Sequence, residues 1–102
     1  MKLLHIIPRL TNGGAETVLA RLVNELSANK IDQVVITIEG DETDFNHQKI
    51  NQFAEVIHLE QSDFNVVQWL DNNPEAKVVA WMYKPILKAH LWASKSKSSP
   101  DI

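Results

Sequence analysis

The sequence predicts an α/β fold, a Rossmann-like three-layer α/β/α domain built around a four-stranded parallel sheet. Short apolar runs alternate along the chain with segments of helical periodicity, which is typical of successive βαβ units. The first apolar run is nearly continuous, as expected for a strand buried on both faces. With 102 residues, 44% of them hydrophobic, the chain is long enough to form one compact core.

The N-terminal part contains the clearest elements. Residues 3–7 are mostly apolar and are followed by Pro8, which predicts a buried strand. After a turn over residues 9–14, apolar residues recur at helical spacing. They predict an amphipathic helix whose inward stripe is Ala15, Val18, Leu19, Leu22, Val23 and Leu26. Residues 33–38 are β-branched and apolar, which predicts the second strand.

Weaker patterns follow in the middle of the chain. Residues 44–54 carry a few apolar side chains among polar ones and predict a second helix. Residues 56–59 predict a short third strand, and residues 64–71 predict a third helix with Val66, Val67 and Leu70 facing inward. The expected N-caps of these two helices are Thr43 for the first and Ser62 or Asp63 for the second.

The last strand and helix complete the alternation. Residues 77–82 predict the fourth strand, and Pro85 marks the first turn of a fourth helix. The apolar spacing of this helix comes from Ile86, Leu87, Leu91 and Trp92. Periodicity is lost from Ser94 onward, so residues 1–94 are expected to form the domain and residues 95–102 a loose tail.

This order of elements predicts a topology. Parallel strands joined by right-handed helical crossovers can form a sheet of order 3-2-1-4. In that order the topological switch point lies beside the carboxyl ends of the first and fourth strands. Ligands of such sheets bind at the switch point, so residues 8–16 and 81–85 are the candidates for a site.

Composition excludes several classes of function. The chain contains no cysteine, which excludes disulfides, cysteine nucleophiles and cysteine-containing zinc sites. Its net charge is −3 and it has no basic block, so no nucleic-acid partner is expected. No run approaches the ~20 apolar residues of a membrane span, and no signal-peptide pattern is visible. A cytoplasmic location is therefore expected.

The strongest local signal is the pair Gly13-Gly14 between the first strand and the first helix. Glycines allow a backbone to approach a ligand closely, and the free N–H groups at a helix start attract an anion. The spacing matches neither G-x-G-x-x-G nor the Walker sequence G-x-x-x-x-G-K-S/T. Two interpretations stay open: the glycines serve only the geometry of the turn, or the turn binds a phosphate or another anion.

Neither Glu16 nor the histidines identify a catalytic group. Glu16 lies in the first helical turn, where the helix dipole stabilises a carboxylate by ~0.5 kcal/mol, and a general base would need a partner that is not found nearby. His5 and His58 fall in predicted strands and are expected to be satisfied or partly exposed sheet histidines rather than ligands, and His90 is expected to be a solvated or edge residue. No metal is expected, because the histidine spacings match no metal-binding motif. No cofactor is expected either, and the catalytic residues stay unidentified.

The sequence Trp81-Met82-Tyr83-Lys84 ends the fourth strand beside the expected switch point. In one interpretation the aromatic side chains wall off a ligand and Lys84 meets an anion. In the other, Trp81 and Met82 belong to the core and Lys84 is a solvated cap. The residues alone leave both interpretations open.

Residues 1–22, MKLLHIIPRLTNGGAETVLARL, resemble the opening of the family-4 retaining glycosyltransferases of the GT-B fold. That family commonly begins with a Lys-Ile-Leu-His-Val-Ile strand, a Gly-Gly-Ala-Glu turn and a helix with a leucine-rich end. Residues 34–38 resemble its second strand. Residues 78–83, VVAWMY, are similar to the Val-Val-x-x-Trp-Met-Tyr of members that build surface or capsular polysaccharides. The three segments occur in the order that the family shows.

The resemblance implies substrate-binding residues at the cleft between two Rossmann-like domains. The positions that it implies are Asn12, Gly13, Gly14, Glu16, Tyr83 and Lys84. The glycines would face the diphosphate of a nucleotide-sugar donor and the acceptor, and residues 82–84 would line the acceptor side. Many relatives carry a histidine where this chain has Lys84, so no histidine-dependent role is carried over.

The resemblance also implies that the chain is an N-terminal fragment. GT-B enzymes have a second domain with a Glu-x7-Glu motif and most of the nucleotide contacts, and four βα units are fewer than a complete first domain. The fragment should be inactive alone, because half a cleft cannot hold donor and acceptor together. The complete enzyme would use a nucleotide-sugar and a polysaccharide or lipid-linked acceptor, with peripheral membrane association as a further expectation.

Two other interpretations do not require an enzyme. In one, the chain is a small non-enzymatic α/β binding or assembly module whose glycine turn is purely architectural. In the other, it is a stand-alone phosphate-binding domain. In the predicted sheet, residues 78–82 form an exposed apolar edge, which favours pairing with another chain. We therefore expect a homo-oligomer formed through the fourth strand or the fourth helix.

Overall fold

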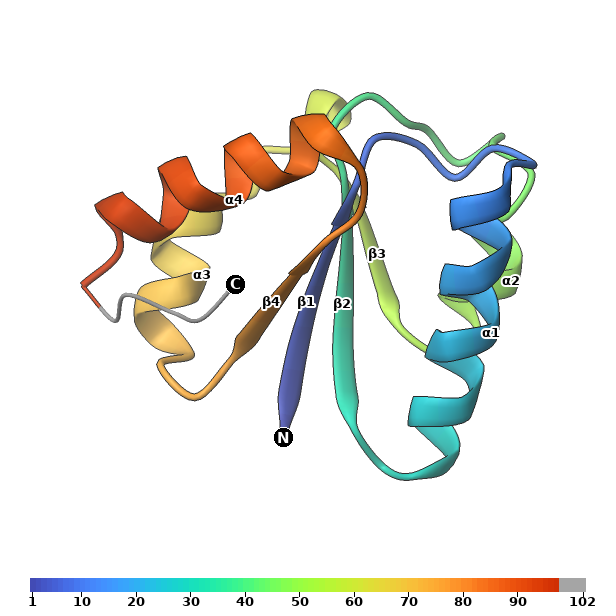
Figure 1. Ribbon diagram of the computed structural model, residues 1–102, viewed down its shortest axis with the longest axis horizontal. Helices are drawn as coiled ribbons and strands as arrows, with labels where there is room; N and C mark the ends of the chain where they lie inside the picture. The colour runs from blue at the N-terminus through green and yellow to red at the C-terminus, as the bar shows by residue number, and fades with distance from the viewer. Residues whose placement is uncertain (98–102) are drawn as a thin grey trace.

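The computed structural model describes residues 1–97, with the backbone but not the side chains of Tyr83 and Lys84. In this part of the chain, a four-stranded parallel sheet of order β3-β2-β1-β4 lies between two layers of helices (Figure 1). The strands are β1 (Lys2–Ile7), β2 (Asp32–Thr37), β3 (Glu55–His58) and β4 (Lys77–Ala80). The predicted fold class and strand order are confirmed.

The helices divide evenly between the two faces of the sheet. Figure 1 shows one pair on each side: α1 (Gly14–Ala28) with α2 (His47–Asn51), and α3 (Val66–Asn72) with α4 (Tyr83–Lys95). A short 3-10 helix, η1 (Leu59–Gln61), follows β3. Because β1 leads to α1 on one face and β4 leads to α4 on the other, the topological switch point lies between β1 and β4, as predicted.

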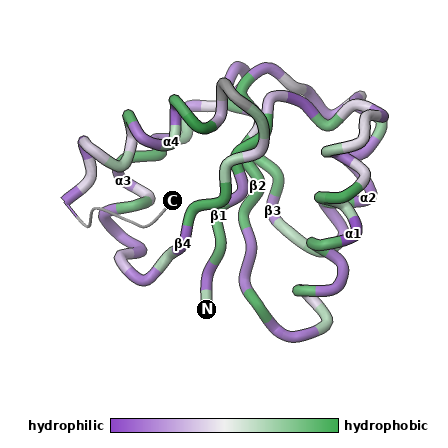
Figure 2. Tube along the Cα trace, in the orientation of Figure 1, coloured by the Kyte–Doolittle hydropathy of each residue, from purple (hydrophilic) through white to green (hydrophobic). Residues whose placement is uncertain are grey.

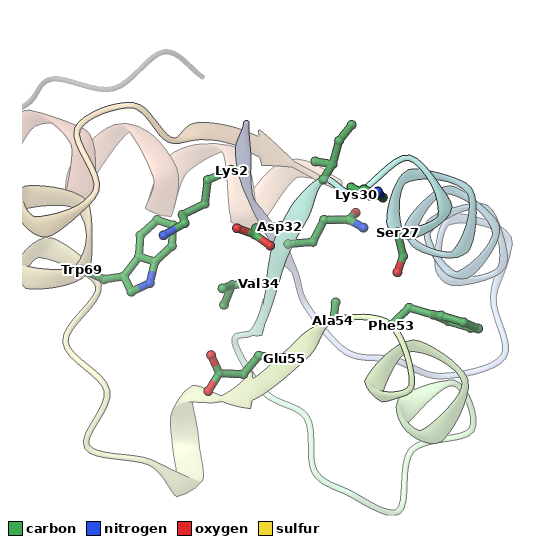
Figure 3. Close-up of a pocket in the computed structure, with 11 residues that line it drawn as sticks. Lys2, Ser27, Lys30, Asp32, Val34, Phe53, Ala54, Glu55 and Trp69 are labelled. Carbon is green, nitrogen blue, oxygen red and sulfur yellow. The ribbon is translucent and has the colours of Figure 1, made fainter.

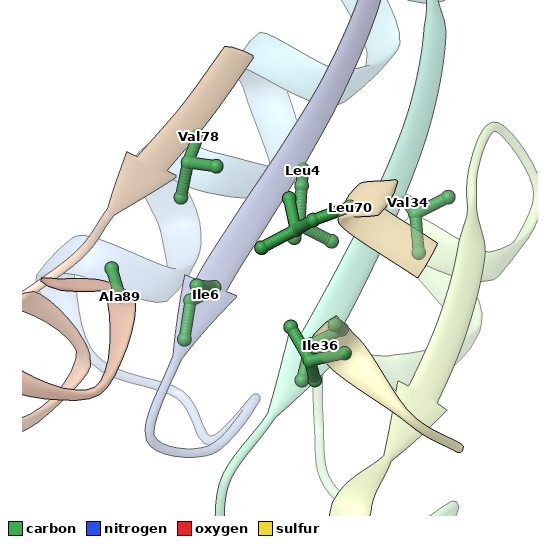
Figure 4. Packing of buried hydrophobic residues seen from close by; sticks show 8 residues of the cluster. Leu4, Ile6, Val34, Ile36, Leu70, Val78 and Ala89 are labelled. Carbon is green, nitrogen blue, oxygen red and sulfur yellow. The ribbon is translucent and has the colours of Figure 1, made fainter. Parts of the chain in front are cut away.

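Each face of the sheet has its own hydrophobic core, because successive strand residues point to opposite faces. The core beneath α3 and α4 consists of Leu4, Ile6, Val34, Ile36, Val66, Leu70, Val78 and Ala89 (Figure 4). The core beneath α1 and α2 consists of Ile7, Leu10, Leu19, Val23, Val35, Ile50 and Ala54. Figure 2 shows the same pattern, with hydrophobic strands at the centre and hydrophilic segments on the helices. Burial on both faces explains the continuous apolar runs of the sequence.

The second helix is shorter than predicted and has a different start. It spans five residues after Asn46, and Thr43 is not its cap. The Thr43 backbone N–H and hydroxyl instead both donate to Asp41 Oδ1, so Thr43 belongs to a local turn around the aspartate. Side-chain to backbone bonds of this kind compete with helix formation, which explains why the helix begins later.

The third helix also begins later than predicted. Its N-cap is Asn65, whose side-chain oxygen accepts a hydrogen bond from the Gln68 backbone N–H at 3.0 Å. The expected caps Ser62 and Asp63 lie before the helix, and Ser62 accepts from the Phe64 backbone N–H at 3.1 Å instead. Ser, Asp and Asn are all favourable N-cap residues, so the sequence offered several possible starts for this helix.

Two predicted inward faces are corrected. On α1 the buried residues are Glu16, Leu19 and Val23, whereas Val18 is 54% exposed. On α4 the inward residues are Pro85, Ala89 and Trp92 at i, i+4 and i+7, whereas Ile86, Leu87 and Leu91 are exposed. The sequence of α4 contains two apolar stripes, and the one formed by Pro85, Ala89 and Trp92 faces the sheet.

The end of α4 is held in place, in contrast to the loose tail expected from residue 95. The helix includes Lys95, and the buried Ser96 donates its hydroxyl proton to Asp71 Oδ1 at 2.9 Å. The Lys97 backbone N–H donates to the same oxygen at 2.7 Å. Residues 98–102 of the expected tail lie outside the described residues. Among the described helices, none is long and apolar enough to cross a membrane.

Candidate functional site

The turn between β1 and α1 is built around a buried carboxylate. Gly13 is the N-cap of α1, and its carbonyl oxygen accepts from the Thr17 N–H at 3.1 Å and the Thr17 hydroxyl at 2.9 Å. Glu16 folds back toward this turn, where its Oε2 accepts from the Thr11 hydroxyl at 2.6 Å. A Cβ on Gly13 would lie 2.6 Å from that oxygen. Gly13 therefore serves the geometry of the turn by leaving room for Glu16.

Gly14 differs from Gly13 because no packing requires it. It is exposed at the first position of α1, and a Cβ there would meet no heavy atom within 4 Å. Its φ is negative, so an ordinary residue could adopt its backbone. What a side chain would change is access to the free N–H groups of the first helical turn, which form an anion-binding environment.

Asn46 attaches this turn to the second helix. It is buried, its backbone N–H donates to the Leu10 carbonyl at 2.8 Å, and its Nδ2 donates to the Thr11 carbonyl at 2.7 Å. Sequence reasoning missed this residue, because its partners lie about 35 residues earlier in the chain. An asparagine just before a helix reads as an N-cap, yet its side chain makes no capping bond here.

Across the switch point, the turn from β4 to α4 has an unusual backbone. Met82 has φ 76° and ψ 175°, a region that non-glycine residues rarely adopt. Its side chain is 57% exposed, so it is not the core residue of one earlier interpretation. Trp81 packs partly against the core beneath α1, and its backbone N–H donates to the Ile6 carbonyl at 2.9 Å.

The four predicted site residues Asn12, Gly13, Gly14 and Glu16 thus share one turn at the carboxyl end of β1. Tyr83 and Lys84 open α4 on the other side of the switch point. Their side chains lie outside the part that the structure describes, so their roles remain predictions.

His5 is a satisfied core histidine, as predicted. It is fully buried in β1, and the Trp81 indole Nε1–H donates to its Nδ1 at 3.3 Å. An indole nitrogen can only donate, so Nδ1 is the acceptor and the imidazole proton lies on Nε2. That proton is donated to Gln33 Oε1 at 3.0 Å, and Gln33 Nε2 donates to the Val23 carbonyl at 3.0 Å. Burial lowers the pKa of His5, which keeps the ring neutral.

A contact between two histidines, His47 and His58, was not predicted from the sequence. His58, also buried, contacts Thr37 Oγ1 through Nδ1 at 2.5 Å and His47 Nδ1 through Nε2 at 2.9 Å. The two imidazoles border a pocket of about 320 Å³. Burial, followed by the charge of His47, lowers the pKa of His58. The cluster has two imidazoles, and the described residues contain no group of three or more metal-ligating side chains.

An ion pair connects the loop after β2 to the β1–α1 turn. Arg9 Nη2 lies 2.7 Å from Asp44 Oδ1, and this bond lowers the pKa of the Asp44 carboxyl. A Cβ on Gly40 would lie 2.8 Å from Asp44 Oδ2 and 2.9 Å from Thr37 Oγ1, so any other residue there would displace these side chains. Arg9 therefore stabilises the loop and is already paired with a carboxylate.

A pocket of about 560 Å³ lies at the opposite end of the sheet (Figure 3). It is lined by the start of β2 and β3 and by side chains of both signs, including Lys30, Asp32 and Glu55. Because ligands of parallel α/β sheets bind at the carboxyl ends of the strands, we do not assign the site to this pocket.

No protein-family model matches the chain, and neither a curated protein nor a solved structure shows a significant match to it. The function is therefore inferred from the fold, the geometry of the two turns and the resemblance of the motifs.

Proposed function

We propose that the chain forms the acceptor-side part of a cytoplasmic glycosyltransferase of the GT-B type. The enzyme would transfer a sugar from a nucleotide-sugar donor to a polysaccharide or lipid-linked acceptor. The observation that carries the proposal is Gly14, an exposed glycine that neither its φ nor its packing requires, at the carboxyl end of β1. A glycine with no structural requirement at the switch point is expected where a ligand approaches the backbone.

The β4–α4 turn also favours a site at the carboxyl ends of β1 and β4. Backbone conformations like that of Met82 are found preferentially at functional sites, where the surrounding structure holds them in place. Met82 immediately precedes Tyr83 and Lys84, the two residues that the resemblance assigns to the acceptor side. Both turns at the switch point thus carry a feature that packing alone does not explain.

The proposed roles follow from this geometry. The N–H groups and the positive dipole end of α1 would stabilise the donor diphosphate. Glu16, Thr11 and Asn46 would hold the turn in the conformation that leaves Gly14 open. Donor binding would depend on a second domain, so the chain alone is not expected to transfer sugar.

Valine at position 14 tests the proposal in the full-length protein that the gene encodes. Gly14→Val should lower kcat/KM for transfer by at least about tenfold, because a displaced ligand costs ~1.4 kcal/mol or more. The control Ala28→Val places a valine at the exposed C-terminal end of the same helix and should leave transfer unchanged. Wild-type kcat/KM in Gly14→Val would refute the role of the turn.

The coding sequence after the codon for Ile102 tests the two-domain part of the proposal. An open frame that continues into a second βα domain with a Glu-x7-Glu motif would support it. A stop codon would instead favour the second candidate, a non-enzymatic binding or assembly module. The observation that favours this second candidate is the set of exposed apolar side chains on α4, Ile86, Leu87 and Leu91.

A further inference from the structure

We infer that a groove between α1 and α2 binds an acidic saccharide, a short oligosaccharide that carries carboxylates. This α1–α2 groove has a volume of about 430 Å³ and extends from Asn12 in the β1–α1 turn along both helices to Phe53. The role of the groove as a subsite for the distal sugars of the acceptor rests on the proposed function. Saccharide binding by the groove can be tested on the chain alone.

The charge of the groove points to an anionic ligand. Arg21 from α1 and Lys49 from α2 line it, and none of its described lining residues is acidic. The whole chain, in contrast, has 13 acidic and 10 basic residues. Within residues 1–97 neither cation forms an ion pair, and both are exposed. The groove is therefore a local cationic surface on an acidic protein, and it complements an anion.

The other lining residues suit the remainder of a sugar. Phe45 and Phe53 border the groove although they are 58% and 40% exposed, and Lys49 Nζ lies 5.0 Å from the centre of the Phe45 ring. Exposed aromatic rings offer flat apolar surfaces for the C–H face of a pyranose. The amides of Asn24 and Gln52 each supply two donors and one acceptor, which suits hydroxyl groups.

A carboxylate fits this groove better than a nucleotide phosphate does. The groove extends along the sides of two helices, where the backbone N–H groups are bonded within the helix and cannot surround a phosphate. The planar guanidinium of Arg21 can bind a carboxylate in a bidentate arrangement, and it needs no backbone N–H groups to do so. Free backbone N–H groups occur instead at the start of α1, at the Asn12 end of the groove and about two helical turns before Arg21.

Titration of the isotope-labelled chain with trigalacturonate, followed by NMR of backbone amides, tests the inference. Saturable shifts are expected at residues 20–24 and 49–53. Galactotriose, the neutral analogue, should bind at least about fivefold more weakly, because ~1 kcal/mol of charge interaction is absent. Arg21→Gln and Lys49→Gln should each weaken trigalacturonate binding by about two- to fivefold. Phe45→Ala should weaken both oligosaccharides.

Lys88→Gln is the matched control, because Lys88 is an exposed cation on α4, on the other face of the sheet. It should leave binding unchanged, and an equal loss in this variant would show non-specific charge attraction and overturn the inference. Absence of saturable shifts, or equal or tighter binding of inorganic phosphate or uridine diphosphate, would overturn it too. Transfer that is sensitive to Gly14→Val without trigalacturonate binding would leave the proposed function standing and refute only the groove.

Discussion

Glu16 and Asn46 hold the β1–α1 turn from two sides. Glu16 accepts a hydrogen bond from the Thr11 hydroxyl, and Asn46 donates to the Thr11 carbonyl. Both side chains are buried, so each bond that breaks leaves a polar group without water. These two side chains therefore help to fix the conformation of the turn that contains Gly14.

Replacement of Asn46 measures how much this attachment stabilises the protein. Asn46→Ala leaves the Thr11 carbonyl without its side-chain donor, so the free energy of unfolding in urea should fall by about 1–3 kcal/mol. Asn46→Asp keeps the shape but removes the Nδ2 donor, and it should destabilise comparably at pH 7. A stable Asn46→Asp would assign the effect to packing instead.

The two buried histidines predict how stability depends on pH. The pKa values of His5 and His58 are lowered in the folded protein, chiefly by burial, whereas the unfolded chain titrates near ~6.5. A protonated His5 would also oppose its Nδ1–H to the Trp81 indole N–H. Below about pH 6.5 the unfolded state therefore binds more protons, and stability decreases as the pH falls.

Urea unfolding between pH 8 and pH 5 measures this dependence, and the free energy of unfolding should decline steadily below about pH 6.5. His58→Gln should reduce the slope, because one of the two groups no longer titrates. The pKa values of the Asp44 and Asp71 carboxyl groups are lowered in the folded protein, so the stability that these groups contribute is lost only at more acidic pH. Constant stability from pH 7 to pH 5 would contradict the expected neutrality of the buried rings.

At the scale of the elements, burial decides which predictions succeed. The four strands were predicted because continuous apolar runs, such as Val34 to Ile36, are typical of strands that are buried on both faces. Helix α4 was located correctly, and Trp92 of its predicted apolar spacing packs against the core. The other three residues of that spacing, Ile86, Leu87 and Leu91, are exposed, and Pro85 and Ala89 face inward instead. The spacing contains both stripes, and only the sheet selects one.

The candidate site also contains features that were predicted from the sequence and features that were not. The Gly13-Gly14 turn was predicted because its signal is contiguous in sequence. The His47–His58 contact was not, since the two residues lie 11 positions apart on α2 and β3 and meet only when both elements pack. Asn46 and Thr11 are separated by 35 positions. Side-chain contacts between elements need the topology as well as the pattern.

The β4–α4 junction contains a strain that glycine should relieve. Met82 has a positive φ, which costs about 1–3 kcal/mol for a non-glycine residue, and its side chain is largely exposed. Glycine relieves this strain but also increases the entropy of the unfolded chain, which offsets part of the gain. Met82→Gly should therefore raise the free energy of unfolding by roughly 1 kcal/mol. Met82→Ala keeps the strain and should bring no such gain. Equal stability of the two variants would show that the backbone is not strained.

At the scale of the whole molecule, the sheet has two edge strands, β3 and β4. Within residues 1–97, β4 pairs with β1 and with no other strand, so it forms one edge of the sheet. Figure 1 shows α4 beside this edge, and its exposed apolar residues add a hydrophobic surface. A second copy related by a two-fold axis would cover the same surface on both chains.

We therefore expect a concentration-dependent dimer in sedimentation velocity. Leu87 and Leu91 are two of the exposed apolar residues of α4 that the dimer would bury. Each buried leucine contributes ~1.5 kcal/mol or more. The double variant Leu87→Ser/Leu91→Ser should therefore raise the Kd of the dimer by at least about tenfold. Val18→Ser is the control, because Val18 on α1 is similarly exposed at 54% but lies on the other face. If the double variant dimerises as tightly as the wild type, the β4 edge alone forms the interface. A wild-type chain that stays monomeric at high concentration would exclude self-association through either element.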